Sequence, residues 1–174
     1  MAVIDVQVRL TATMPAKVLA RLQRNMGLLL KAAATLGVPV FASEQYPKGL
    51  GSLEPDILRL LPASARRYEK TSFPLTEADG FLADLSASGR RQVVLTGMEA
   101  HVCILQTALR LMQEGFQPFV VADAVCSRQR ESYETALERL RQAGVVVCDA
   151  ESVVFEWMRD SRHEHFKAIQ ALVR

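Results

Sequence analysis

Three residues of this chain, Asp5, Lys70 and Cys103, are of the types needed for acyl transfer by a thiol. A cysteine becomes a strong nucleophile when it loses its proton, and a nearby carboxylate can take that proton and later return it. A lysine ammonium can stabilise the negative charge that forms on sulfur. Cys103 ends the motif GMEAHVC, which lies between an apolar run and an amphipathic segment. This is the pattern of a strand-to-helix junction, where the first helical turn favours an anion.

Each of these residues also has an ordinary structural interpretation. A cysteine after a strand is commonly packed into a core, an aspartate at a strand end commonly forms a turn, and a lysine in YEKTSF is usually solvated. The chemical interpretation therefore depends on whether three strand ends bring the three residues together. Cys126 falls in an expected turn and Cys148 in an expected strand, where we predict structural roles.

Other common site types fit this sequence poorly. The histidines are His101, His163 and His165. A Cys–His pair would need His101, but it lies two positions before Cys103, and residues two apart on a helix do not face each other. No H-x-x-x-H or D-x-H pattern supplies metal ligands, and no glycine-rich phosphate motif is present. We therefore expect neither a metal nor a cofactor.

Strand-like and helix-like segments alternate along the chain. Strands are predicted at 2–6, 38–43, 66–73, 92–97 and 118–125 and within 144–157, with helices between them. One helix should begin at Pro15 and stop at Gly37, and the terminal helix should cover 163–174. This alternation predicts an α/β fold with three layers (α/β/α), in which helices cover both faces of a doubly wound, Rossmann-like sheet of six mainly parallel strands.

The connections refine this picture. Residues 44–55 are predicted to be a loop, and the sequence 76–79 (TEAD) fits a capping box for a helix carrying Phe81 and Leu85. Open α/β sheets bind ligands beyond the carboxyl ends of their strands. We therefore expect Asp5, Lys70, Cys103 and Asp123 to converge at one edge of the sheet, together with residues 43–45 at the end of the second strand.

The bulk properties are those of an ordinary globular protein. Apolar residues make up 49% of the 174 residues, charged residues 23%, and the net charge is +2. We expect a single domain over 1–174, in which 159–174 forms a C-terminal helical segment. The arginines are interleaved with glutamates, which argues against nucleic-acid binding. No stretch resembles a membrane span or a signal peptide, and three unpaired cysteines favour a cytoplasmic location.

Several motifs together resemble one known family. VIDVQ near the start, YEKTSF in the middle and VVLTGMEAHVCILQTALRLMQEGF followed by VVADAVCSR resemble the isochorismatase-like cysteine hydrolases, in the right order over residues 2–157. The resemblance implies a six-stranded parallel sheet and a catalytic triad of Asp5, Lys70 and Cys103. It also implies a cis peptide bond between Met98 and Glu99, with the backbone N–H groups of Glu99 and Cys103 as the oxyanion hole.

Departures from the family pattern narrow the expected activity. The nicotinamidase branch has a D-x-H metal motif after its second strand, but this chain reads SEQYPKGLG there and resembles the isochorismatase domain-containing branch. The resemblance implies a cofactor-free hydrolase that cleaves a C–N bond of a small amide-like substrate through a thioester. The residues expected to line the substrate pocket are Gln7, Tyr46, Phe73, Glu99 and His101.

Two other functions stay open at this stage. The chain could be a catalytically quiet binding or scaffold protein that acts through its oligomer surface, for which Phe155, Trp157 and Met158 offer an apolar patch. A redox role for Cys103 would need a resolving cysteine, and none is near in sequence. For partners we expect a small-molecule substrate and a homo-oligomer, either a dimer or a tetramer, with no nucleic acid and no membrane.

Overall fold

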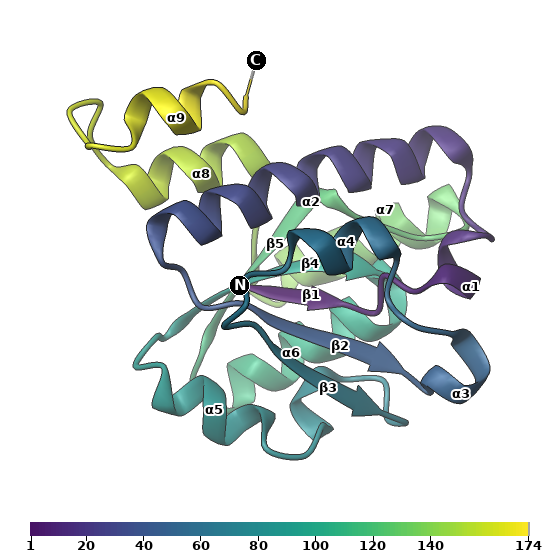
Figure 1. Cartoon of the computed structure of the whole chain (residues 1–174). Coiled ribbons are helices and arrows are strands. Elements are labelled where there is room, and N and C mark those ends of the chain that lie inside the picture. The colour runs from purple at the N-terminus through teal and green to yellow at the C-terminus, as the bar shows by residue number, and fades with distance from the viewer. Residues whose placement is uncertain (174) are drawn as a thin grey trace.

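The computed structural model of the chain describes residues 1–173 and contains one six-stranded sheet, in the order β3-β2-β1-β4-β5-β6 (Figure 1). Every pair of neighbouring strands runs parallel. The strands are β1 (Ala2–Ile4), β2 (Phe41–Gln45), β3 (Arg66–Lys70), β4 (Gln92–Met98), β5 (Gln117–Cys126) and β6 (Val146–Cys148). The strand order reverses direction between β1 and β4, which is where a doubly wound sheet opens a crevice for ligands.

Helices cover both faces of this sheet (Figure 1). They are α1 (Val8–Thr11), α2 (Ala16–Leu36), α3 (Pro47–Leu50), α4 (Pro55–Leu60), α5 (Phe81–Ala87), α6 (Leu105–Gln113), α7 (Arg130–Gln142), α8 (Ala150–Met158) and α9 (Phe166–Gln170). A 3₁₀ turn spans Leu75–Glu77 and a π-helix spans Ala100–Ile104. The three-layer α/β/α prediction is therefore confirmed.

Two apolar cores lie on the two faces of the sheet. One packs α2, α4, α8 and α9 against the strands, with Met26, Ile57 and Val154 among its buried members. The other packs α5, α6 and α7 against the opposite face, around residues such as Phe81 and Leu111. Because both faces are covered, the strands are nearly continuous apolar runs, and any polar side chain buried at their ends needs a specific partner.

Helix α2 begins and ends where the sequence predicted, at Pro15 and Gly37. Pro15 caps its start, and Gly37 ends it in the left-handed conformation, with a φ of 64°. Glycine has no Cβ to clash in that conformation, which is why it commonly terminates helices.

Three local predictions were wrong. Residues 44–55 are not all loop, because α3 lies inside the segment and α4 begins at its end. The 76–79 capping box does not form: Gly80, with a φ of 78°, precedes α5, and the buried hydroxyl of Thr76 has no hydrogen-bond partner among the described residues. Cys126, expected in a turn, is instead the last residue of β5, which pairs with β4 with a register shift.

Within the predicted helical segment 159–174, helix α9 occupies only Phe166–Gln170, and Arg174 lies outside the described residues. None of the helices in the described part of the chain is both long enough and apolar enough to span a bilayer.

Gly97 makes the closest backbone approach between the two central strands. It has a φ of 115°, and a Cβ at this position would lie 2.0 Å from the carbonyl oxygen of Ile4. Both features require glycine, since an L-residue is strained at this φ and real Cβ atoms do not approach backbone so closely. The position matters because Ile4 precedes Asp5 in sequence.

We predict that Gly97→Ala destabilises the protein by about 3 kcal/mol or more, because strand β1 would have to move away from β4. The measurement is the free energy of unfolding in urea. Gly27→Ala is the matched control: it lies inside α2, its Cβ would meet only Leu60 Cδ1 at 3.6 Å, and it should be stabilising by up to about 1 kcal/mol. Equal stability of the two variants would contradict the role given to Gly97.

Candidate active site

Asp5, Lys70 and Cys103 meet at the carboxyl edge of the sheet. Lys70 Nζ lies 2.7 Å from Asp5 Oδ2 and 3.7 Å from Cys103 Sγ. Asp5 follows β1, Lys70 is the last residue of β3, and Cys103 lies in the π-helix after β4. The side chains of Asp5 and Lys70 are completely buried, and Cys103 is 6% exposed. A carboxylate, an ammonium and a thiol are thus in mutual reach and shielded from bulk water.

The Lys70 ammonium is held by oxygen atoms on several sides. Besides Asp5, it donates to Gln45 Oε1 at 2.6 Å and to the backbone carbonyls of Phe73 at 2.9 Å and Ser72 at 3.3 Å. An unpaired buried ammonium is very costly, so this set of acceptors is what allows Lys70 to remain charged below the protein surface. It also fixes the ammonium beside Cys103.

Asp5 is oriented by both its backbone and its carboxylate. Its Oδ1 accepts a hydrogen bond from Ser43 Oγ at 2.7 Å, while Oδ2 faces Lys70. Its backbone adopts the left-handed conformation, with a φ of 52°, which is uncommon for a residue other than glycine. Such strain persists where surrounding contacts hold it, and here the Asp5 N–H donates to Ser43 O.

Ser43 and Gln45 were expected at the converging strand ends, but no contact with Asp5 or Lys70 was predicted for them. Both lie on β2 and point to the same side of the sheet, because side chains two residues apart in a strand share a face. Their alternate positions at the end of β2, which place both side chains on the face opposite Glu44, are the signal that could have predicted these contacts. Gln45 contacts Lys70 directly, and its amide is anchored by a bond from Nε2 to Thr71 O.

The Cys103 thiol is protonated in the resting site. Burial and then the Asp5 carboxylate raise its pKa, the Lys70 ammonium opposes them, and the net result is a pKa of about 12. The sulfur therefore does not rest as a thiolate at neutral pH. Its proton can instead move to Asp5 as the sulfur reacts, which is general-base activation rather than a preformed anion.

The backbone before Cys103 turns sharply out of β4. The peptide bond between Met98 and Glu99 is cis, and the chain then enters the π-helix, which continues directly into α6. The carbonyl of Glu99 accepts the N–H groups of Val102 and Ile104. Short π-helical turns are rare and are common at functional sites, because they shift a side chain off the regular helical path.

Two of the five residues expected in the pocket wall are exposed, and the other three are buried or partly buried. Tyr46 and Phe73 are exposed, at 53% and 51%, and each lies within three residues of a site residue in sequence. Gln7 is fully buried, and its amide bonds to the backbone of Gln45 and Gly51. Gln7 therefore ties the loop after β2 to the loop after β1.

The other two pocket candidates contact the loop that follows β5. Glu99 Oε1 accepts both the backbone N–H of Arg128, at 3.0 Å, and its Nε, at 3.1 Å. His101 Nδ1 lies 2.9 Å from Ser127 Oγ, which leaves Nε2 as its free ring nitrogen among the described contacts. These contacts join the segment before Cys103 to residues 127–128.

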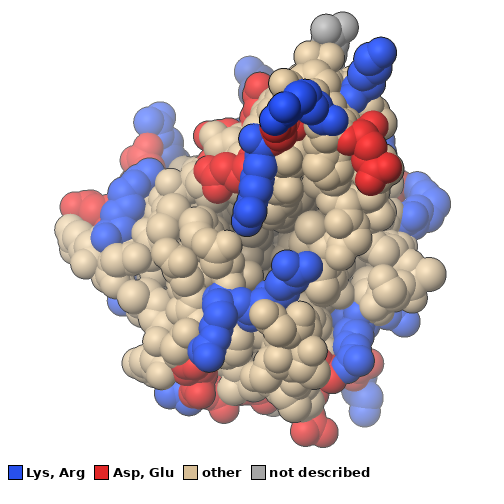
Figure 2. Space-filling view, turned by 90° about the vertical axis from the view of Figure 1, so that its left-hand side faces the viewer, with Lys and Arg blue, Asp and Glu red and all other residues tan. Residues whose placement is uncertain are grey.

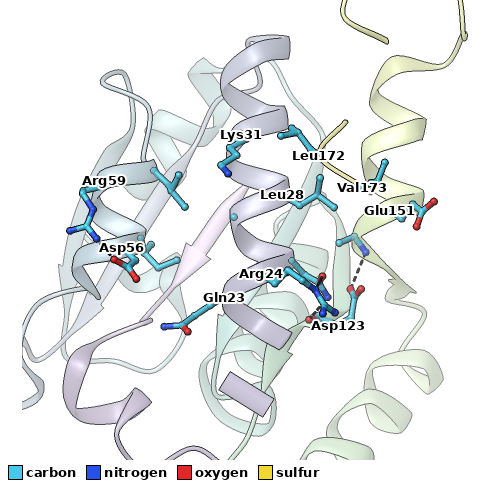
Figure 3. A pocket seen from close by; sticks show the side chains of 15 residues that line it. Gln23, Arg24, Leu28, Lys31, Asp56, Arg59, Asp123, Glu151, Leu172 and Val173 are labelled. Carbon is cyan, nitrogen blue, oxygen red and sulfur yellow. Dashed lines mark hydrogen bonds and ion pairs between the residues drawn. The ribbon is translucent and has the colours of Figure 1, made fainter. Parts of the chain in front are cut away.

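Asp123 does not join the cluster. Its Oδ1 accepts the N–H of Ala150 at the start of α8, and it lines a hollow of about 820 Å³ between α2, α4 and α8 (Figure 3). Cys126 is buried and Cys148 partly buried, each away from Lys70. Within residues 1–173, no group of three or more His, Cys, Asp or Glu side chains is arranged to hold a metal ion.

Comparison with known proteins identifies the family. The isochorismatase domain matches residues 1–152. The chain belongs to the isochorismatase family. Among curated members of this family, isochorismatase domain-containing protein 1 of Danio rerio is 43% identical over 148 residues, which are 84% of this chain and 51% of that protein. The chain thus spans about half the length of this relative.

Several solved structures share the fold. MAR1 ribonuclease from Caenorhabditis elegans superposes with a TM-score of 0.91 at 30% identity, over 99% of this chain and 87% of that one. The YcaC gene product of Escherichia coli, described as an octameric hydrolase of unknown specificity, superposes with a TM-score of 0.86 at 22% identity, over 99% and 90% of the two chains.

The protonated resting thiol gives a testable pH dependence. Alkylation of Cys103 by iodoacetamide should keep rising with pH through pH 10, because thiolate forms only as the pH approaches the raised pKa. In Asp5→Asn the carboxylate that disfavours thiolate is gone while Lys70 remains, so the same rise should begin at lower pH. Peptide mass spectrometry at Cys103 measures the rates, and circular dichroism checks the fold. A plateau below pH 8 in the unmodified protein would contradict this assignment.

Proposed function

We propose that the chain is a cofactor-free cysteine hydrolase that cleaves a C–N bond of a small amide-like substrate through a thioester acyl-enzyme. The observation that supports this most directly is the contact of Lys70 Nζ with both Asp5 and Cys103 in a buried site. A nucleophile, a base and a fixed cation are the groups that acyl transfer by a thiol needs.

Acylation follows from the positions of these groups. Cys103 Sγ attacks the substrate carbonyl carbon while the thiol proton passes to Asp5. The carbonyl oxygen becomes an oxyanion, for which we propose the backbone N–H groups of Glu99 and Cys103 as donors. Asp5 then gives the proton to the leaving nitrogen, the C–N bond breaks, and the amine or ammonia departs.

Deacylation uses the same base a second time. Asp5 takes a proton from a water molecule as the water oxygen attacks the thioester carbonyl. The C–S bond breaks, the carboxylic acid leaves, and the proton returns to sulfur. Throughout both steps Lys70 holds Asp5 in place and stabilises negative charge on Cys103.

The residues around the site suggest the kind of substrate. Tyr46 and Phe73 are exposed aromatic residues whose backbone atoms contact Lys70, and His101 is a partly buried residue two positions before Cys103. We propose that these three side chains form the pocket wall, with Glu99 and Gln7 supporting the loops behind it. Aromatic walls with a few polar groups are typical of small-molecule sites.

Turnover of small amides tests the proposal. Cys103→Ser should lower kcat/KM by about 10³-fold or more, because a hydroxyl beside Asp5 is a much weaker nucleophile than a thiol. A panel of primary amides, with released ammonia as the readout, provides the measurement. Cys148→Ser is the matched control and should retain activity, since Cys148 lies on the edge strand β6 with its sulfur against the Val120 carbonyl.

The same panel distinguishes the cysteine hydrolase from a binding or scaffold protein and from a ribonuclease. A thioester mass adduct on Cys103 after rapid quenching supports the acyl-enzyme. No amide turnover and no adduct across the panel would contradict the hydrolase proposal and favour a binding or scaffold protein. A fluorogenic RNA belongs in the panel because one solved neighbour is named as a ribonuclease. RNA cleavage that survives Cys103→Ser would also contradict the proposal.

Glu99 and Arg128 are proposed as positioning residues. Their double hydrogen bond ties the segment carrying Cys103 to the loop after β5. Arg128→Ala should lower kcat about tenfold with little change in KM, since a small displacement of catalytic groups affects the transition state most. Glu99→Gln keeps an acceptor oxygen and should retain more activity than Glu99→Ala.

The control for this pair is Arg110→Ala, which removes an exposed pairing with Glu77 and should leave kcat unchanged. Equal kcat values for Arg128→Ala and Arg110→Ala would rule out positioning through Arg128.

We also propose a homo-oligomer. Half-exposed Tyr46 and Phe73 beside the site are consistent with subunit contacts, and the E. coli neighbour is described as octameric. Light scattering of the purified chain distinguishes a dimer or tetramer from an octamer.

A further inference from the structure

A second hollow lies at the opposite edge of the sheet from Cys103. It has a volume of about 1090 Å³ and is bordered by the starts of β2, β4 and β5, by the turn before β4 and by α8. We call it the amino-end groove and define it by Arg90, Arg91, Arg159, Phe155, Trp157 and Phe119. Figure 2 shows this face hollowed at its centre, with Lys and Arg side chains standing on both sides.

The border of the groove is strongly basic. Arg90 and Arg91 lie in the turn between α5 and β4, and Arg159 lies across the groove at the end of α8. All three are exposed, and none of them forms an ion pair within residues 1–173. Among the described residues that line the groove, Glu156 is the one carboxylate. The groove therefore has positive charge that the described chain does not neutralise.

The floor of the groove is apolar. Val94, Phe119 and Val153 line it, and Phe155 stands 36% exposed at its side. Trp157, also in the lining, is the single tryptophan of the chain. An apolar floor between separated guanidinium groups matches an occupant that carries both apolar side chains and carboxylates.

We propose that the amino-end groove binds a peptide segment of a partner protein in which acidic and apolar residues are combined. The apolar side chains contact Val94, Phe119 and Trp157, and the carboxylates pair with Arg90, Arg91 and Arg159. Single-stranded RNA would also meet arginines and aromatic rings, but the aliphatic floor and Glu156 favour peptide over phosphates. This inference does not depend on the proposed hydrolase activity, because the groove shares no residue with the site around Cys103.

The single tryptophan makes the test direct. The probe is an eight-residue peptide in which pairs of glutamates alternate with pairs of leucines, titrated into the full chain while Trp157 fluorescence is recorded. We expect a saturable change that weakens as salt is raised, because the pairing is electrostatic. A peptide with lysines in place of the glutamates should bind at least tenfold more weakly.

Charge reversal locates the binding. The double variant Arg90→Glu/Arg91→Glu should weaken the acidic peptide at least tenfold. The matched control, Arg139→Glu/Arg141→Glu, changes the net charge equally on exposed positions of α7 and should bind within twofold of the unmodified chain. Circular dichroism shows whether each variant is folded, and the single variant Arg159→Glu gives an independent reading from the other side of the groove.

Several results would overturn the proposal. These are no fluorescence change with the acidic peptide, equal weakening by the two double variants, or tighter binding of a twelve-nucleotide oligouridine than of the peptide. Light scattering that shows self-association lost in Arg90→Glu/Arg91→Glu would assign the groove to a second copy of this chain instead.

Discussion

The buried ion pair between Lys70 and Asp5 is the constraint around which the carboxyl edge of the sheet is organised. Removing two charges from water is costly, and the attraction between them offsets that cost only if the remaining polar atoms are also satisfied. Ser43, Gln45 and the carbonyls of residues 72–73 supply those partners. Three strands and the loop after β3 must therefore be in register before the pair can form.

The same burial sets the chemical state of Cys103. A dry site strengthens the influence of Lys70 on sulfur, but it also penalises a thiolate, and the penalty is the larger effect. In the proposed mechanism, Cys103 therefore stays neutral until its proton passes to Asp5 during attack on the substrate. A neutral thiol is also less open to oxidation than an exposed thiolate, which disfavours a redox role.

Sequence patterns predicted the architecture well, since alternating apolar strands and amphipathic helices leave few topologies once crossovers are right-handed. They also pointed to Asp5, Lys70 and Cys103, because strand ends on one edge of a parallel sheet are neighbours. They failed where tertiary contacts decide local structure. Helix α4 starts within a Gly- and Pro-rich segment, and the TEAD segment could not start a helix because Gly80 redirects the chain. The raised pKa of Cys103 depends on burial and distances that no motif encodes.

The loop after β3 is attached to the site by its backbone. Lys70 binds the carbonyl oxygens of Ser72 and Phe73, not their side chains. Evolution can therefore replace the side chain at Phe73 without loosening the ammonium that the triad needs. Under the proposed function, substrate range can diverge at this position within a lineage while the reacting groups stay unchanged, so variation at Phe73 would trace the history of specificity separately from that of the chemistry.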